Sequence, residues 1–162
     1  MKLMNRTARG FTIVEIMVIV AIIGILTAIG FVSFGSIQSS TRDYQRSSRV
    51  KLISEALEKY YDNNGEYPGC TAMSQTPATV VNDTLQGLDP NVLTAPSAES
   101  GTNSISALCA DLTAGVDGFS YIGDTNSACL TGNSCLRYTL KYKEEGSGTV
   151  KLINSRRLSG SH

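Results

Sequence analysis

The feature that most constrains this chain is an uncharged apolar run over residues 16–34, in which only Thr27 and Ser33 carry polar side chains. An α-helix rises about 1.5 Å per residue, so the run reaches roughly 28 Å, close to the hydrocarbon thickness of a bilayer. Glu15 stands directly before the run, where a carboxylate without a partner is costly in apolar surroundings. We therefore expect a membrane-length helix whose first carboxylate has a function.

Three interpretations of this N-terminal region are open. A secretory signal peptide has a basic start, a shorter apolar region and a cleavage site, for which Ser33-Phe34-Gly35 would serve. A single-pass anchor explains the length of the run but gives no role to Glu15. A class III signal is cut before the apolar run, so that the run stays in the product. Residues 1–10, which carry three basic and no acidic side chains, would then be removed.

The stretch Gly10-Phe11-Thr12-Ile13-Val14-Glu15 favours the third interpretation, because it resembles the processing site of type IV prepilins and related pseudopilins. The resemblance covers about residues 5–35, and Gly24 also stands where these helices commonly carry a glycine. It implies that residues 1–10 are a leader peptide and that a prepilin peptidase cuts between Gly10 and Phe11. It also implies that the new amino group of Phe11 is methylated.

Glu15 follows Phe11 by four residues, so the two lie on one face of a helix. Cleavage would leave an ammonium group on Phe11, and a paired buried charge is more tolerable than a lone one. Glu15 would neutralise the terminus of its own chain or that of a neighbouring copy, and the second case would set the register of assembly. The alternative is a glutamate that stands at the membrane interface by chance.

The helix departs from the family pattern at one position. Many type IV pilins carry a proline where this chain has Val32. Gly24 and Gly30 would still loosen the helix, because a glycine inside a helix costs about 1 kcal/mol relative to alanine. We therefore assign helix flexibility to these two glycines.

Beyond residue 35 we expect the helix to continue over residues 36–64 as an amphipathic segment. Val50, Ile53, Leu57 and Tyr60 recur at helical spacing and form an apolar stripe. The end of the helix is signalled by Asn63-Asn64-Gly65. The charged residues of this segment are assigned to its remaining surface, namely Arg46, Arg49, Glu55, Glu58 and Lys59.

The C-terminal part of the chain predicts a small β-sheet. Residues 65–118 are rich in small and polar residues and indicate a variable loop region with one or two short helices. Strands are expected at 119–122, 136–143 and 149–153, within a sheet region over residues 119–158 that precedes a tail at 159–162. The fold class is therefore α+β, with a long N-terminal helix packed on an antiparallel sheet. The resemblance implies the type IV pilin fold, whose helix has an apolar first half over residues 11–35.

Four cysteines indicate disulfides rather than a metal site. They contain no C-x-x-C pair, and the single histidine, His162, ends the sequence, so the spacings do not suit zinc. Disulfides imply an oxidising compartment, which places the leader in the cytoplasm and the remainder outside it. We predict Cys129–Cys135, which encloses a five-residue loop, and Cys70–Cys109, while the other two connectivities stay open.

The sequence contains no constellation typical of catalysis. It lacks an internal histidine, a G-x-S-x-G motif, an H-E-x-x-H motif and a phosphate-binding loop. Asp111, Asp117 and Asp124 lack the spacing of a calcium loop, so we expect solvated acids there. Asn82-Asp83-Thr84 matches a glycosylation sequon, which is a weak pattern. The basic C-terminal hairpin is a candidate contact for DNA or a surface ligand, or for the acidic middle of a neighbouring copy.

We therefore expect a structural, non-enzymatic subunit of a type IV pilus, without a cofactor or a metal. It would be inserted once into the inner membrane with its N-terminus in the cytoplasm, processed by prepilin peptidase, and passed to an inner-membrane assembly platform. There it would join a homopolymer of like subunits as an extracellular pilus for adhesion, twitching motility or DNA uptake. The alternatives are a minor pilin, a pseudopilin of type II secretion, and a monomeric membrane-anchored binding domain.

Overall fold

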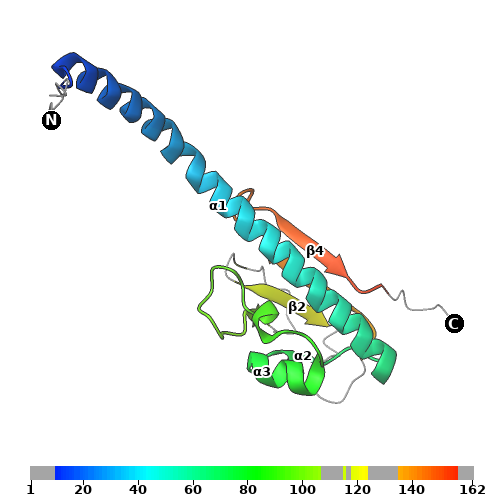
Figure 1. The fold of residues 1–162 in the computed structure, drawn as a ribbon. Coiled ribbons are helices and arrows are strands. Elements are labelled where there is room, and N and C mark those ends of the chain that lie inside the picture. The colour runs from blue at the N-terminus through cyan, green and yellow to red at the C-terminus, as the bar shows by residue number, and fades with distance from the viewer. Residues whose placement is uncertain (1–9, 107–114, 116–117, 124–134, 157–162) are drawn as a thin grey trace, which may run out of the picture. The chain divides into compact units, whose positions relative to one another are not determined.

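The computed structural model describes residues 10–106, 115, 118–123 and 135–156, without the side chains of residues 30–34. The chain divides into two compact units, Met1–Gln38 and Ser39–His162. The longest element, helix α1, runs over Ile13–Asn64 (Figure 1). The residues of α1 as far as Gln38 belong to the first unit, and its remaining residues belong to the second. Each unit is described by itself below.

In the first unit, the described side chains of α1 are exposed and mostly apolar, the polar ones being Glu15, Thr27, Ser36 and Gln38. Ile13 is 81% exposed, and the described large apolar residues as far as Ile29 are likewise exposed. Nowhere in the part of the chain with described side chains is a helix sufficiently long and apolar to cross a membrane. The span predicted over residues 16–34 includes residues 30–34, whose side chains lie outside that part.

In the second unit, α1 packs through one stripe of apolar side chains, as its spacing predicted. Val50, Ile53 and Leu57 are fully buried, and Tyr60 is packed partly buried against the same core. The helix ends at Asn64, and Gly65 follows with φ +77°, the left-handed conformation expected of a C-terminal glycine. The predicted stripe and stop signal are both confirmed.

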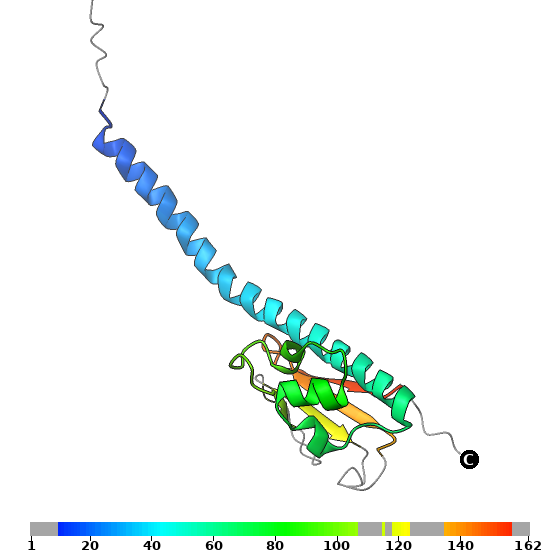
Figure 2. The same ribbon diagram turned by 60° about the horizontal axis from the view of Figure 1, so that its bottom comes forward.

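The second unit also contains a four-stranded sheet in the order β1-β2-β3-β4. The strands are β1 (Ile105–Ser106), β2 (Phe119–Gly123), β3 (Tyr138–Lys143) and β4 (Val150–Asn154). The three strands predicted from the sequence, β2 to β4, pair antiparallel (Figure 2). The fourth, β1, pairs parallel to β2 and was not predicted, because two residues are too few to show a period of two.

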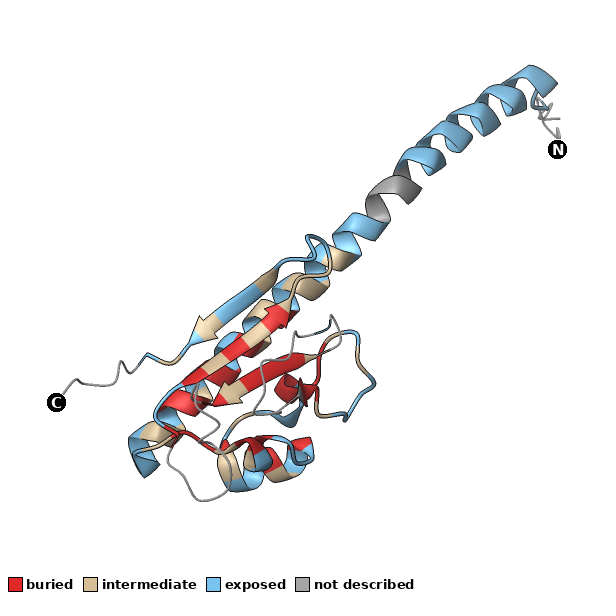
Figure 3. Ribbon diagram, turned by 180° about the vertical axis from the view of Figure 1, so that it is seen from behind, coloured by how far each residue is buried: buried red, intermediate tan, exposed pale blue. Residues whose placement is uncertain are grey.

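One face of the sheet closes the core of the second unit. Along β3 the side chains alternate between buried and partly exposed, with Tyr138, Leu140 and Tyr142 buried. Phe119 and Tyr121 of β2 are fully buried beside them, whereas β4 is largely exposed (Figure 3). The fold is thus the predicted α+β arrangement, in which a helix packs on an antiparallel sheet.

Four short helical elements precede the sheet. They are α2 (Cys70–Met73), α3 (Pro77–Thr79), the π-helical turn η1 (Val80–Thr84) and the 3₁₀ turn η2 (Pro90–Leu93). Prolines begin α3 and η2, where their missing N–H costs nothing. These elements add Met73, Val80 and Leu93 to the core, so this polar region is anchored by apolar residues.

The structure corrects the sequence prediction for two charged residues of α1. Arg46 and Glu58 were assigned to the solvent-facing surface, but Arg46 is 0% exposed and Glu58 is 9% exposed. Both are buried because hydrogen-bond partners from distant parts of the chain surround them, as described below. A helical hydropathy pattern contains no information about such partners.

Candidate functional site

The predicted processing segment lies at the start of α1 and forms a capping box. The Thr12 backbone N–H and hydroxyl donate to the Glu15 carboxylate over 2.8 and 2.7 Å, and the Glu15 N–H donates back to the Thr12 hydroxyl over 3.3 Å. The helix begins at Ile13, so Thr12 is its N-cap and Glu15 its third residue. Threonine three residues before glutamate is the sequence signature of this motif, so the cap could have been predicted from the sequence.

The residues on either side of the predicted cut are accessible. Phe11 is 74% exposed, Gly10 is exposed, and no atom lies within 4 Å of the position that a Cβ on Gly10 would take. A peptidase needs an open backbone at the bond it cleaves. Cleavage after Gly10, methylation of Phe11 and the register role of Glu15 stay predictions.

Helix α1 is continuous through both glycines to which flexibility was assigned. Gly24 lies on an open helical surface, with no atom within 4 Å of the place where a Cβ would stand, and the Thr27 hydroxyl donates to the Ile23 carbonyl over 2.6 Å. Such a bond competes with the backbone ladder and is often found where helices bend. For Gly30 and Val32 only the helical backbone is described, and helix flexibility stays a prediction.

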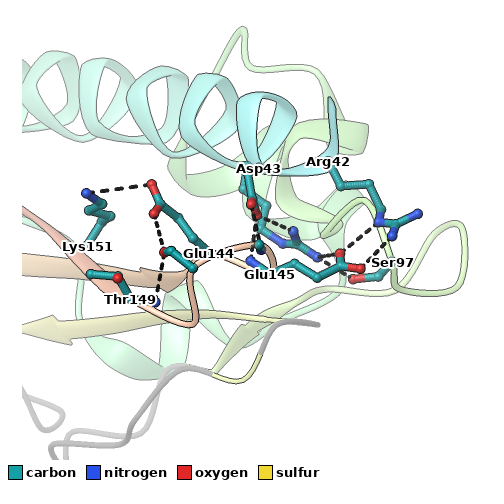
Figure 4. Close-up of polar contacts among 10 residues, drawn as sticks. Arg42, Asp43, Ser97, Glu144, Glu145, Thr149 and Lys151 are labelled. Atoms are coloured by element: carbon teal, nitrogen blue, oxygen red, sulfur yellow. Dashed lines mark hydrogen bonds and ion pairs between the residues drawn. The ribbon is translucent and has the colours of Figure 1, made fainter. Parts of the chain in front are cut away.

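In the second unit, a cluster of charged residues attaches the β3–β4 turn to α1 (Figure 4). The Asp43 carboxylate accepts the backbone N–H groups of Glu145 and Gly146 over 2.7 and 2.9 Å. Arg42 donates through two nitrogens to the Glu145 carboxylate, the Nε bond being 2.7 Å long. We call Arg42, Asp43, Arg46 and Glu145 the turn clasp. It is a two-sided attachment, since a helix acid binds turn N–H groups and helix arginines bind a turn acid.

Arg46 is the buried centre of the turn clasp. Its guanidinium donates to Asp43 over 2.9 Å, to Glu145 over 3.2 Å and to the Ser97 hydroxyl over 2.9 Å. A buried arginine is tolerated only when its charge is paired and its N–H groups are bonded, and both conditions hold here. One turn further along α1, Arg49 donates to the Thr94 carbonyl, so two arginines tie the helix to the segment after η2.

The turn clasp changes the acidity of its carboxyl groups. The hydrogen bond from Arg42 lowers the pKa of Glu145 to about 2, with Arg46 contributing in the same direction. Burial alone would raise the pKa of Asp43, but the N–H groups of Glu145 and Gly146 and the guanidinium of Arg46 outweigh it. The pKa of Asp43 therefore lies below its ordinary value, and both groups are ionised at neutral pH.

A buried carboxylate, Glu58, lies between α1 and the sheet. It accepts the Tyr67 hydroxyl over 2.9 Å, the Tyr138 hydroxyl over 3.1 Å and the Arg156 backbone N–H over 3.0 Å. The Ser54 hydroxyl lies 2.8 Å from the Tyr138 hydroxyl. Burial, with the nearby Glu58 charge, raises the pKa values of both tyrosines above their ordinary value. The tyrosines therefore stay protonated and act as donors, so Glu58 is a structural acceptor.

The structure describes two of the four cysteines, Cys70 and Cys135. Cys70 and Cys135 are buried and disulfide-bonded, and the Tyr67 backbone N–H donates to the Cys135 carbonyl over 2.7 Å. Cys109 and Cys129 lie outside the described residues, so the pairings Cys70–Cys109 and Cys129–Cys135 stay predictions. The acids weighed for calcium, Asp111, Asp117 and Asp124, also lie outside them. Among the described residues, no group of three or more metal-ligating side chains is arranged to hold an ion.

Comparison with known proteins identifies a motif in the N-terminal segment. The family model described as the prokaryotic N-terminal methylation motif matches residues 5–31. A fimbrial protein of Neisseria meningitidis serogroup A is 32% identical over 112 residues, which are 62% of this chain and 62% of that protein. Over part of its length, this chain is therefore similar to fimbrial proteins and type IV pilins. No solved structure is significantly similar to this chain.

Other similar proteins align with this chain over shorter regions. A fimbrial protein of Neisseria meningitidis serogroup B is 38% identical over 69 residues, which are 41% of this chain and 39% of that protein. The type IV major pilin PilA of Myxococcus xanthus is 33% identical over 63 residues, which are 39% of this chain and 29% of that protein. The chain thus spans less than two thirds of the length of these relatives.

Proposed function

We propose that this chain is the structural subunit of a type IV pilus. The observation that carries the proposal is the combination of the methylation motif over residues 5–31 with the exposed apolar side chains of α1 that lie within it. Exposed apolar surface on this scale marks an interaction site, and in a filament it would be covered by the same helix of neighbouring copies. The relatives named fimbrial protein and type IV major pilin support the same role.

In this proposal the precursor is held in the inner membrane with residues 1–10 in the cytoplasm. Prepilin peptidase cuts after Gly10 and methylates Phe11, and an inner-membrane platform adds the subunit to the filament. Glu15 is then close to an ammonium group, either on its own Phe11 or on that of a neighbour, and pairing of these charges fixes the stagger between copies. The role is structural rather than enzymatic, and it serves adhesion, twitching motility or DNA uptake.

Mass spectrometry of the mature N-terminus tests the processing step. The expected result is a chain that begins at methylated Phe11. A terminus at Ser36 would instead identify ordinary secretion, and an intact leader would identify a plain anchor. Either result would overturn the proposal, since both leave no prepilin-type product.

Assembly is tested by comparing filaments from Glu15→Val, Glu15→Asp and unaltered chains. Glu15→Val should still insert into the membrane, because the substitution removes a charge. In the filament, however, the ammonium group of Phe11 would be buried without a partner, which costs more than about 1.4 kcal/mol. The yield of sheared filaments should therefore fall at least about tenfold. Glu15→Asp keeps the charge and should retain more assembly. Normal filaments from Glu15→Val would refute the register role. A chain found only as a rare component of filaments would be a minor pilin, and retention at a secretion complex would identify a pseudopilin.

A further inference from the structure

A polar groove of about 270 Å³ lies in the second unit, apart from the turn clasp and the Glu58 cluster. One wall is the last part of α1, with Ala56, Lys59, Tyr60, Asn63 and Asn64. The other wall is η1 and the turn after it, with Asp83, Thr84 and Gln86. No part of the proposed pilin function uses these residues.

The groove has fixed walls. Next to its exposed residues, Val80 and Leu85 are buried in the core, and the Leu85 N–H donates to the Val80 carbonyl over 2.7 Å. On the helix side, the Asn64 side-chain amide donates to the Tyr60 carbonyl over 2.8 Å. Rigid elements on both sides keep polar groups in position without a large ordering cost on binding.

The side chain of Lys59 reaches the turn after η1, close to Gly87. Gly87 has φ +88°, and the Lys59 ammonium lies 3.8 Å from the position that a Cβ at residue 87 would take. The turn therefore needs glycine for its backbone conformation, and the ammonium group lies within ordinary contact distance of that turn. The cation thus lies near the edge of the groove.

The polar side chains of the groove have unused hydrogen-bonding capacity. Within the described part of the chain, the side chains of Lys59, Asn63, Asp83 and Gln86 make no hydrogen bond or ion pair. The charged residues that hold the fold together, such as Arg46 and Glu58, are by contrast fully engaged. The groove therefore gathers groups that are available to a ligand.

The chemistry of these groups selects a hydroxyl-rich ligand. Each carboxamide of Asn63 and Gln86 offers both donors and an acceptor, which match hydroxyl groups that also donate and accept. Lys59 and Asp83 bring opposite charges, so the groove does not favour a polyanion. Tyr60 contributes an apolar ring beside these polar groups. The volume is below the roughly 300–1,000 Å³ of sites for drug-sized molecules, so the ligand is small.

We propose that this groove binds a saccharide of one or two sugar rings. Asn63 and Gln86 bind its hydroxyl groups, Asp83 accepts from one more, Lys59 donates to ring or hydroxyl oxygens, and Tyr60 packs against a ring face. Binding depends only on the folded second unit. Its use in adhesion rests on the proposed pilus function, because a filament would present many such grooves and multiply a weak affinity.

The test is saturation-transfer-difference NMR on the full chain in detergent micelles, with lactose, N,N′-diacetylchitobiose and 3′-sialyllactose as probes at about 10 mM. We expect transfer to at least one probe with a millimolar dissociation constant. Asn63→Ala and Gln86→Ala should each weaken it about fivefold, the equivalent of one hydrogen bond. Asp83→Asn should weaken it more than the matched control Glu99→Gln, an exposed acid outside the groove.

Absence of transfer to all three probes would overturn the proposal, as would binding that is unchanged in both Asn63→Ala and Gln86→Ala. Circular dichroism of each variant shows whether the fold is intact, and Asn63→Asp and Gln86→Glu provide a second pair if either alanine variant unfolds. Failure here leaves filament assembly untouched. Failure of the Phe11 and Glu15 experiments, conversely, leaves sugar binding to the folded unit unaffected.

Discussion

The carboxylate of Glu145 accepts two hydrogen bonds from the guanidinium of Arg42, although 103 residues separate them in the chain. Two parallel bonds between these groups give the strongest and most directional type of ion pair. Together with Asp43, which binds the backbone of the same turn, the pair fixes the β3–β4 hairpin to α1. The position of the most C-terminal strands thus depends on a short stretch of the helix.

Replacing Asp43 tests the turn clasp. In Asp43→Ala the backbone N–H groups of Glu145 and Gly146 lose their acceptor, and the buried Arg46 loses one of its two acidic partners. The free energy of unfolding should therefore fall by about 2–3 kcal/mol, which urea unfolding at pH 7 measures. Asp43→Asn keeps an acceptor oxygen without the charge and should cost less. Equal losses in the two variants would mean that charge alone, rather than turn binding, matters.

The turn clasp also predicts a dependence of stability on pH. The pKa of Glu145 is about 2 in the folded chain against an ordinary 4.5, so its contribution is fully present above about pH 4.5 and is lost as pH falls through about 2. Melting temperatures recorded between pH 6 and pH 2 should therefore fall more steeply in the unaltered chain than in Glu145→Gln. Parallel curves would contradict the assignment, whatever the contribution of other acids.

Glu58 should be more important for stability than its charge suggests. Glu58→Ala would leave the hydroxyls of Tyr67 and Tyr138 and the Arg156 N–H without their acceptor in the core, at a cost of about 3 kcal/mol in unfolding free energy. Glu58→Gln keeps one acceptor oxygen and should cost less. Denaturant unfolding measures both, and exposed Glu55→Ala on the same helix is the control, which should stay within about 0.5 kcal/mol.

Thr12 should hold both the start of α1 and the carboxylate of Glu15. Thr12→Val removes the hydroxyl of the capping box and should destabilise the first turn by about 1 kcal/mol. Amide hydrogen exchange in micelles should then be about fivefold faster at the first-turn residues. Thr12→Ser keeps the hydroxyl and should exchange normally. Unchanged exchange in Thr12→Val would show that the cap does not form in the micelle.

Periodicity and turn chemistry predicted much of this fold. The buried face of α1 was predicted from the spacing of Val50, Ile53 and Leu57, and strand β3 from the alternation in residues 136–143. Both predictions succeed because buried apolar side chains recur with the period of the helix or the strand. The capping box could also have been predicted from the sequence, since Thr12 and Glu15 have the spacing of that motif. Local sequence therefore identifies both elements and their ends.

Arg46 and Glu58 could not be predicted in the same way. Their burial depends on Ser97 and Glu145 for the first, and on Tyr67 and Tyr138 for the second, which lie 9 to 99 residues away. Such pairs follow from tertiary structure, and a single sequence provides no measure of which distant residues meet. The groove lined by Asn63 and Gln86 could not be predicted from the sequence for the same reason.

The burial of Arg46 has a consequence for the order in which the chain is made. Asp43 lies on the same helix, but Ser97 and Glu145 are synthesised long after α1, so two of the three partners of Arg46 are missing while most of the second unit emerges from the ribosome. Core closure around it before the β3–β4 turn is made would bury a guanidinium that has one acid in place of two and unbonded N–H groups. A nascent chain that stops before residue 145 should therefore remain open to proteases, and α1 becomes locked in place only when the last hairpin has been made.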